Sequence, residues 1–212
     1  MNNIRLLFKK EDISCFTSHL DMTRAFSRAI FAKQLPIWFT EGFHPHPYMV
    51  FGQPLPLGMA GEREFLDLKL LSDIPDVELI SKLNEQLPQG IEVVSVGEPY
   101  FKAKEIAFAR FRTEIDASYA PKFEEMWNNE QVMITKKSKR GEKMLDLKAE
   151  AKELSTEIKG DKLVINCVLP CTSSGAITSV TLIDAFKQYI NEEVFARHVR
   201  CEFIHESGES FR

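Results

Sequence analysis

Two histidines lie in a proline-rich segment, Gly42-Phe43-His44-Pro45-His46-Pro47. Because side chains alternate along an extended chain, His44 and His46 should point the same way. Neutral imidazoles could bind a metal ion or contact a phosphate. A metal site would need further ligands, and none is adjacent in sequence. We therefore favour a rigid, proline-locked loop that packs Phe43 and Tyr48, and we expect no bound metal.

A second group with possible chemistry is His19, Arg24 and Arg28. At helical spacing, Arg24 and Arg28 share a face with Asp21 and lie away from the apolar stripe. In one interpretation the two guanidinium groups contact an anion beside the His44–Pro47 loop. In the plainer one, Asp21 and Arg24 form a surface pair worth about 0.2–0.5 kcal/mol.

A basic run between residues 136 and 143 is the third candidate. The run contains five cationic residues and only one carboxylate, Glu142. The cationic residues are Lys136, Lys137, Lys139, Arg140 and Lys143. Such a run on an acidic chain could contact a phosphate backbone. A solvated hairpin tip explains it equally well.

Several chemistries are excluded by missing motifs. The sequence has no GxxxxGK[ST] phosphate loop, no GxGxxG after a strand, no GxSxG and no HExxH. The sequence also lacks the CxxxCxxC signature of radical SAM enzymes. Its four cysteines are Cys15, Cys167, Cys171 and Cys201. We therefore expect no radical chemistry in this chain, no cofactor and no intrinsic catalytic activity.

Composition places these residues in a soluble chain. With 212 residues and a net charge of −4, one large domain or two small ones fit, and a wholesale basic coat for nucleic acid is excluded. The first ten residues are charged and no apolar run reaches membrane-spanning length, so we expect a cytoplasmic protein without a membrane partner. The scattered cysteines agree with a reducing compartment.

The first half of the chain predicts a strand–helix–strand–strand–helix–strand order. Ser18 and Asp21 form a capping box, which predicts a helix over 18–34. The strands are expected at 4–9, 37–40, 64–70 and 91–96, and a second helix begins at Asp76. Residues 42–61 form a Gly/Pro-rich loop with a short edge strand near Tyr48–Phe51.

The second half repeats this order less clearly. Strands are expected at 108–115, 132–135, 163–169 and 197–204, with helices at 119–129 and after Thr178 or Ser179. A polar insert occupies 136–161. The pattern predicts an α+β protein of two tandem ferredoxin-like (split βαβ) units with antiparallel sheets, 1–100 and 107–206.

Several motifs together resemble a known family. They are Ser18-His19-Leu20-Asp21, Arg24-Ala25-Phe26, Gly42–Pro47 and Pro54-Leu55-Pro56-Leu57-Gly58. In this order they are similar to the radical SAM-linked protein family, a bacterial domain of unknown function. Its members occur alone or joined to a radical SAM protein with a cobalamin-type domain, so the resemblance implies a radical SAM partner. The family loop usually has Asn where this chain has His44.

These observations lead to one function and two alternatives. We expect a noncatalytic RNA-binding or substrate-presenting accessory protein linked to a radical SAM RNA-modifying enzyme, with tRNA or rRNA as the RNA. The candidate RNA- or anion-binding residues are His19, Arg24, Arg28, His44, His46, Lys136, Lys137, Lys139 and Arg140. The alternatives are a metal-independent RNA-processing enzyme that uses histidines as acid and base, and a protein–protein scaffold for the radical SAM partner.

Overall fold

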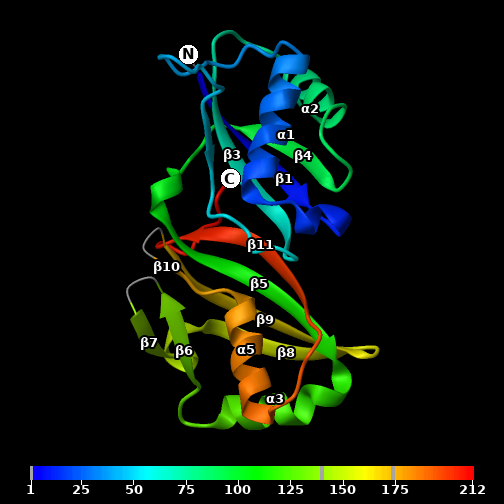
Figure 1. Ribbon diagram of the computed structural model, residues 1–212, viewed down its shortest axis with the longest axis vertical. Helices are drawn as coiled ribbons and strands as arrows, with labels where there is room; N and C mark the ends of the chain where they lie inside the picture. Colours follow the sequence, from blue (N-terminus) through cyan, green and yellow to red (C-terminus); the bar gives the residue numbers. More distant parts are fainter. Residues whose placement is uncertain (1, 139–140, 173–174) are drawn as a thin grey trace. The chain divides into compact units, whose positions relative to one another are not determined.

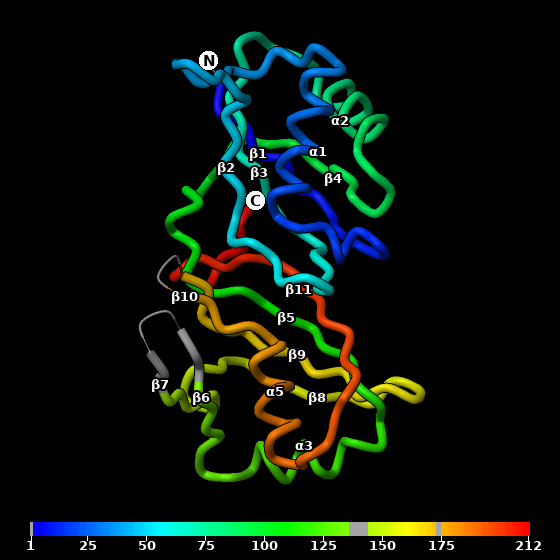
Figure 2. The backbone as a smooth tube through the Cα atoms, in the orientation of Figure 1, coloured from blue at the N-terminus to red at the C-terminus, as the bar shows by residue number. Residues whose placement is uncertain are grey.

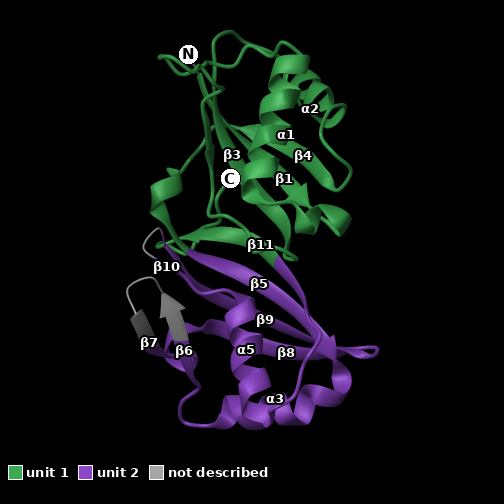
Figure 3. Cartoon of the chain, in the orientation of Figure 1, with its two compact units in different colours: residues 1–107, 200–212 green, residues 108–199 purple. Residues whose placement is uncertain are grey.

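The computed structural model describes residues 2–138, 141–172 and 175–212, with residues 136–138 and 141–143 described through their backbone alone. The fold is mixed α+β, and its sheet pairing is mainly antiparallel (Figure 1). Contacts divide the chain into unit 1, residues 1–107 and 200–212, and unit 2, residues 108–199 (Figure 3).

Unit 1 alternates strands and helices along most of its length. Its elements are β1 (Asn2–Lys10), the 3-10 turn η1 (Asp12–Phe16), α1 (His19–Ala32), β2 (Met49–Phe51), β3 (Ala60–Leu70), α2 (Asp76–Asn84), β4 (Ile91–Gly97) and the 3-10 turn η2 (Ala103–Glu105). The last part of β11 (Arg197–His205) also belongs to unit 1.

Helix α1 begins where the capping residues predict. The Ser18 Oγ accepts a hydrogen bond from the Asp21 backbone N–H at 3.1 Å, and the Ser18 hydroxyl donates to the Asp21 carboxylate at 2.7 Å. This side-chain oxygen satisfies one of the N–H groups that a helix start leaves unpaired. The helix is confirmed, with its regular part ending at Ala32, ahead of Pro36.

The sheet of unit 1 has one face under helices and one face without them. β1 pairs antiparallel with both β3 and β4, and β2 pairs antiparallel with β3. Alternate residues of β1 and β3, such as Leu6 and Leu66, pack with Phe26 of α1 and Leu79 of α2 in the core. The residues between them, including Asp67, therefore project from the opposite face, which we call the outer face.

Part of the outer face is covered by the chain's last residues. Arg5 lies over Phe65, with its guanidinium carbon 4.0 Å from the ring centroid. Phe211 stacks on Phe65, with 5.6 Å between ring centroids and an interplanar angle of 4°.

The segment expected as a strand over 37–40 is instead a pair of isolated bridges. Ile37 pairs with Leu70, and Phe39 pairs with Pro47. The ladder around Phe39 does not extend because the neighbouring N–H groups bond elsewhere: the Trp38 N–H donates to the Lys69 carbonyl, and the His46 N–H donates to the Thr40 side chain. From the end of α1 the chain passes through this segment and turns back into β2 (Figure 2). The short edge strand predicted near Tyr48–Phe51 is confirmed as β2.

Unit 2 places three α-helices, one of them a single short turn, and several strands around its own core. The elements are β5 (Ile106–Asp116, from residue 108 on), the 3-10 turn η3 (Ala117–Tyr119), α3 (Ala120–Asn128), β6 (Met133–Ser138), β7 (Gly141–Asp146), α4 (Leu147–Glu150), β8 (Lys152–Lys159), β9 (Lys162–Thr172), β10 (Gly175–Ala176), α5 (Ser179–Ile190) and the start of β11. β9 pairs antiparallel with β5, β8 and β10. Phe123 of α3 and Phe186 of α5 meet edge-to-face at 5.3 Å.

The polar insert expected at 136–161 contains regular secondary structure, which its polar composition does not predict. β8 falls within it and pairs with β9, although its residues are mostly exposed. Charged side chains are common on such edge strands, where they discourage further pairing. Residues 200–206, expected in the second unit, are grouped with unit 1. Two independent ferredoxin-like domains at 1–100 and 107–206 remain a prediction.

Candidate functional site

His19 is the first residue of α1, and its ring lies against β2. The imidazole meets Phe51 edge-to-face, with 5.2 Å between ring centroids. Burial lowers the pKa of His19, and the nearby positive charge of Lys10 lowers it further. This histidine is therefore held mainly as the neutral imidazole near pH 7.

The two arginines of α1 lie at its exposed surface. The Arg24 side chain is 64% exposed, and its Nη1 is 3.2 Å from the Asp21 carboxylate. This surface pair is the plainer interpretation of the two residues, and its contribution to stability is small. Arg28 is also exposed, and it makes no ion pair with any residue that the structure describes.

The His-Pro loop is exposed and held mainly by its backbone. The His46 N–H donates to Thr40 Oγ1 at 3.2 Å, and the His46 carbonyl accepts from the Thr40 N–H at 2.9 Å. His44 is exposed, and Phe43 is fully exposed. The expectation that this loop packs Phe43 is therefore wrong, because the ring has nothing over it. Tyr48 does pack, against Trp38.

His19 and the His-Pro loop belong to opposite ends of α1. The helix has 14 residues, which corresponds to about 21 Å at 1.5 Å per residue. The loop begins beyond the helix C-terminus, where Phe31 contacts Phe39 at 4.9 Å. Among the residues in view, no hydrogen bond or ring contact joins His19 to His44 or His46. A shared anion site there stays a prediction.

The basic run cannot be placed as a surface. Lys139 and Arg140 lie outside the described residues. Lys136 and Lys137 belong to the backbone of β6, and Lys136 pairs in register with Lys143 of β7. The role of this run in RNA binding stays a prediction.

A different cationic site lies in unit 1, on the outer face of the sheet. It is a pocket of about 440 Å³, within the size range of small-ligand sites. We call it the outer-face pocket, and it is lined by Asn3, Tyr48, Val50, Asp67, Lys69, Pro99, Lys102, Ala103 and Lys104. The lining comes from β1, β2, β3 and the segment around η2, which are distant in sequence.

The pocket carries an excess of positive charge. Asp67 is its carboxylate, and both of its oxygens are engaged by Arg5 at 2.7 and 2.8 Å. The pocket also has three lysines, Lys69, Lys102 and Lys104. None of them makes an ion pair with a carboxylate in the described ranges 2–138, 141–172 and 175–212. The three lysines therefore line the pocket without a carboxylate partner among the described residues, and this excess of positive charge attracts an anion.

Lys69 stands between two aromatic rings at one side of this pocket. Its Nζ is 4.9 Å from the Trp38 ring centroid and 4.6 Å from that of Tyr48. The Trp38 N–H donates to the Lys69 carbonyl at 2.8 Å, and the Tyr48 N–H donates to the Trp38 carbonyl at 3.0 Å. These backbone bonds fix the three residues in register, so the rings and the cation are pre-positioned.

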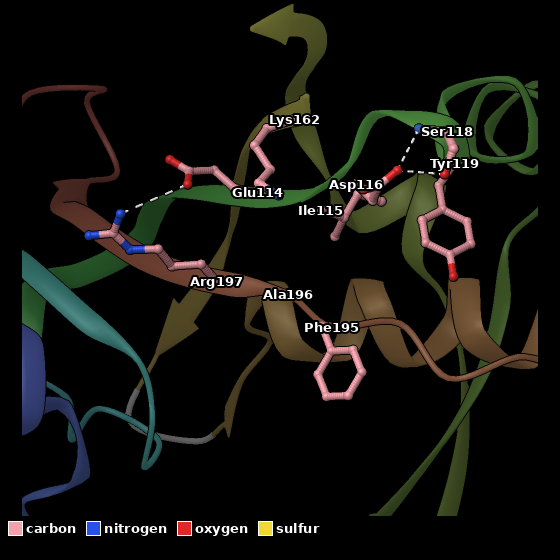
Figure 4. Close-up of a pocket in the computed structure, with 9 residues that line it drawn as sticks. All are labelled: Glu114, Ile115, Asp116, Ser118, Tyr119, Lys162, Phe195, Ala196 and Arg197. Atoms are coloured by element: carbon pink, nitrogen blue, oxygen red, sulfur yellow. Dashed lines mark hydrogen bonds and ion pairs between the residues drawn. The ribbon is translucent and has the colours of Figure 1, made fainter. Parts of the chain in front are cut away.

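A larger pocket, of about 870 Å³, lies in unit 2 (Figure 4). Its charges are largely compensated within the protein. Arg197 approaches Glu114 at 3.9 Å, and Lys162 is 3.2 Å from Asp161. Asp116 accepts hydrogen bonds from the Ser118 N–H and hydroxyl, which lower its pKa. This pocket has no comparable charge excess, so the outer-face pocket is the better candidate.

The part of the chain that the structure describes contains no cluster of three or more His, Cys, Asp or Glu side chains suited to a metal ion. None of its helices combines the length and apolar character needed to cross a bilayer.

The fold and this pocket define an α+β protein with a pre-positioned cationic and aromatic surface. Residues 3–179 match the model of a family described as "Uncharacterized protein conserved in bacteria (DUF2344)". The match covers most of the chain, so the protein belongs to this family. No curated protein matches the sequence.

No motif in the sequence marks the residues of the outer-face pocket. Trp38, Tyr48 and Lys69 are ordinary strand or loop residues in sequence, and Lys102 and Lys104 stand in a short linker. One signal was available. In the strand at 64–70 the alternating pattern places Asp67 and Lys69 on the face opposite the core. The partners on that face depend on long-range pairing.

Proposed function

We propose that this chain is a noncatalytic RNA-binding or substrate-presenting accessory protein, acting with a radical SAM RNA-modifying enzyme in the cytoplasm. The observation that carries the proposal is the outer-face pocket, where three lysines without carboxylate partners lie beside Tyr48. Family membership supports a bacterial setting. The radical SAM partner is supported by the motif resemblance, and tRNA or rRNA would be the bound RNA.

The pocket offers the two interactions on which sequence-tolerant RNA binding depends. Lysines neutralise phosphates and release counterions, and aromatic rings stack with bases. Lys102 and Lys104 are exposed, whereas Tyr48 is half-buried and fixed by its backbone bond to Trp38. A phosphate-bearing ligand with planar bases uses both kinds of side chain, whereas a simple anion needs the lysines alone.

The sheet of unit 1 supports the further proposal that the chain is built from ferredoxin-like units. Its antiparallel strand order, β4-β1-β3-β2, is the order that a split βαβ unit requires. In such a unit both helices cover one face, which leaves the other available to a ligand. The outer-face pocket lies on that second face.

The central experiment measures RNA binding by the variant Lys102→Ala/Lys104→Ala. Fluorescence anisotropy with labelled tRNA and rRNA fragments, over a series of salt concentrations, gives the affinity and its salt dependence. Each lost phosphate contact should reduce the slope of log K against log salt by about 0.7 for a single-stranded RNA. We expect weaker binding at low salt and a shallower slope than in the wild type.

A matched control removes two lysines elsewhere. Lys159→Ala/Lys162→Ala changes the net charge equally but acts in unit 2, where both lysines already pair with carboxylates. It should bind like the wild type. Equal loss in both double variants would point to net charge alone, and absence of binding by the wild type would refute the proposal. Arg24→Ala/Arg28→Ala, run in parallel, tests the predicted contact at α1.

The noncatalytic part is tested in the same samples. Incubation of the labelled RNA with the wild type in EDTA should leave the RNA intact. Cleavage that disappears in His46→Ala and persists in Lys159→Ala would instead support the metal-independent processing enzyme.

A further inference from the structure

We propose that the outer-face pocket takes one unpaired nucleotide of a single-stranded RNA segment, with its base at Tyr48 and its flanking phosphates at Lys102 and Lys104. This inference rests on the proposed RNA-binding function and states which form of RNA the site accepts. It excludes double-stranded RNA as the preferred ligand.

The concave shape is the first argument. Tyr48 and Asp67 line a hollow in the outer face. In an A-form duplex each base is covered on both sides by its neighbours, and the backbone forms the convex surface. A duplex therefore cannot offer a base to Tyr48 without opening, whereas an unpaired base can enter the pocket.

The arrangement of the rings is the second argument. Lys69 Nζ lies over both Trp38 and Tyr48, and the two ring centroids are 5.6 Å apart. The ammonium and the backbone bonds hold the rings before any ligand binds. Little side-chain freedom is then lost on binding, which favours stacking of a base beside them.

The position of the two exposed lysines is the third argument. Lys102 and Lys104 flank Ala103 at the start of η2, and the Lys102 N–H donates to the Glu105 carboxylate at 2.6 Å. This bond closes a short turn, so both side chains start from a fixed backbone while their ammonium groups remain adjustable. They can therefore follow the phosphates on either side of one inserted nucleotide.

The base edge would meet two polar side chains that also line the pocket. The Asn3 amide both donates and accepts hydrogen bonds, and it is exposed. Asp67 keeps lone pairs beyond the two that Arg5 uses. These groups fit the hydrogen-bonding edge of an unpaired base, which is occupied when the base is paired.

The test compares one labelled RNA oligonucleotide of about ten nucleotides with the same strand in a perfect duplex. We expect the wild type to bind the single strand at least about tenfold more tightly. Tyr48→Leu should weaken single-strand binding about tenfold and leave the salt slope unchanged, because a stacking contact releases no counterions. Tyr48→Phe keeps the ring and should keep the affinity.

The control and the outcomes separate this inference from the proposed function. Tyr189→Leu removes an exposed tyrosine in unit 2 and should have no effect. Equal affinity for single strand and duplex, or full affinity in Tyr48→Leu, overturns the inference and leaves RNA binding intact. Failure of the wild type to bind either RNA overturns both. If Tyr48→Leu does not fold, the inference is still tested by the wild-type affinities for the single strand and the duplex, and by the affinity of Tyr48→Phe.

Discussion

At the scale of single residues, unit 1 contains charged side chains that composition would place at the surface. Arg200 and Glu64 form an ion pair whose side chains are only 1% and 6% exposed, and Arg200 also donates to the Gln53 carbonyl. Lys10 is almost fully buried, donates to the Cys15 and Thr17 carbonyls, and has its pKa lowered by burial. Such groups are stable only because each has partners.

The buried ion pair leads to a stability prediction. Glu64→Gln leaves the Arg200 charge in the interior without its carboxylate, and we expect a loss of about 3–5 kcal/mol in the free energy of unfolding. Urea unfolding followed by circular dichroism measures it.

Glu78→Gln is the matched control for this change. It breaks an exposed pair with Lys82 on α2, worth about 0.3–0.5 kcal/mol. Similar losses in the free energy of unfolding in the two variants would mean that burial does not increase the contribution of the Arg200–Glu64 pair to stability.

Residue types alone could not have identified the outer-face pocket. Sequence reasoning favoured Arg24, Arg28, His44 and His46 because their spacing is noticeable locally. The pocket instead combines β3, the Trp38–Tyr48 region and the η2 segment, which come together only through pairing between distant strands. Whether a lysine has a carboxylate partner depends on the folded structure and cannot be recognised in the sequence.

At the scale of elements, local signals predicted the helices better than the strands. The Ser18–Asp21 capping box placed the start of α1, and the bond from the Asp21 N–H to Ser18 confirms it. The segment 37–40 was expected to be a strand from its β-forming residues, but it forms only isolated bridges, because the Trp38 and His46 N–H groups donate to Lys69 and to the Thr40 side chain. β8 was missed because an exposed edge strand has no apolar alternation.

His198 links three elements of unit 2. Its Nδ1 lies 3.3 Å from Thr113 Oγ1 of β5 and 3.0 Å from Ser179 Oγ of α5. Burial lowers the pKa of His198 to about 4, and the charge of Lys187 lowers it further. In the unfolded chain the same imidazole takes up a proton near pH 6.5.

This shift predicts a loss of stability in mild acid. Between pH 6.5 and 4 the unfolded state binds a proton that the folded state excludes, so the free energy of unfolding falls as the pH decreases. We expect His198 to contribute a decrease of about 1–2 kcal/mol between pH 7 and pH 5, measured by urea unfolding at each pH.

The variant His198→Gln should reduce this pH dependence. His44→Gln, which changes an exposed histidine, should retain it. A decrease of unchanged size in His198→Gln would show that its source lies elsewhere, for example at His19, whose pKa burial also lowers.

At the scale of the whole molecule, the proposed role requires a surface for a protein partner as well as one for RNA. Around η1 and the start of α1, several apolar side chains are more than half exposed, namely Ile13, Phe16, Leu20 and Leu57. Exposed apolar patches of this kind commonly mark protein contacts. We call these four residues the η1 patch and expect it to contact the radical SAM partner.

Phe16→Asp should reduce recovery of the radical SAM partner by at least about tenfold in co-purification from ribonuclease-treated extracts. The ribonuclease removes partners that are held through RNA alone. Phe195→Asp, which changes an exposed phenylalanine of unit 2, should leave recovery unchanged. Full recovery with Phe16→Asp would exclude the η1 patch as the contact.

The composition of unit 1 has a consequence for biosynthesis. Arg200 and Phe211, which neutralise Glu64 and cover Phe65, are translated long after the strand that they complete. Unit 2 is one uninterrupted stretch and can finish folding on the ribosome earlier. Until those residues emerge, the nascent polypeptide has strands β1 to β4 but lacks the positive charge that pairs with Glu64 and the ring that covers Phe65.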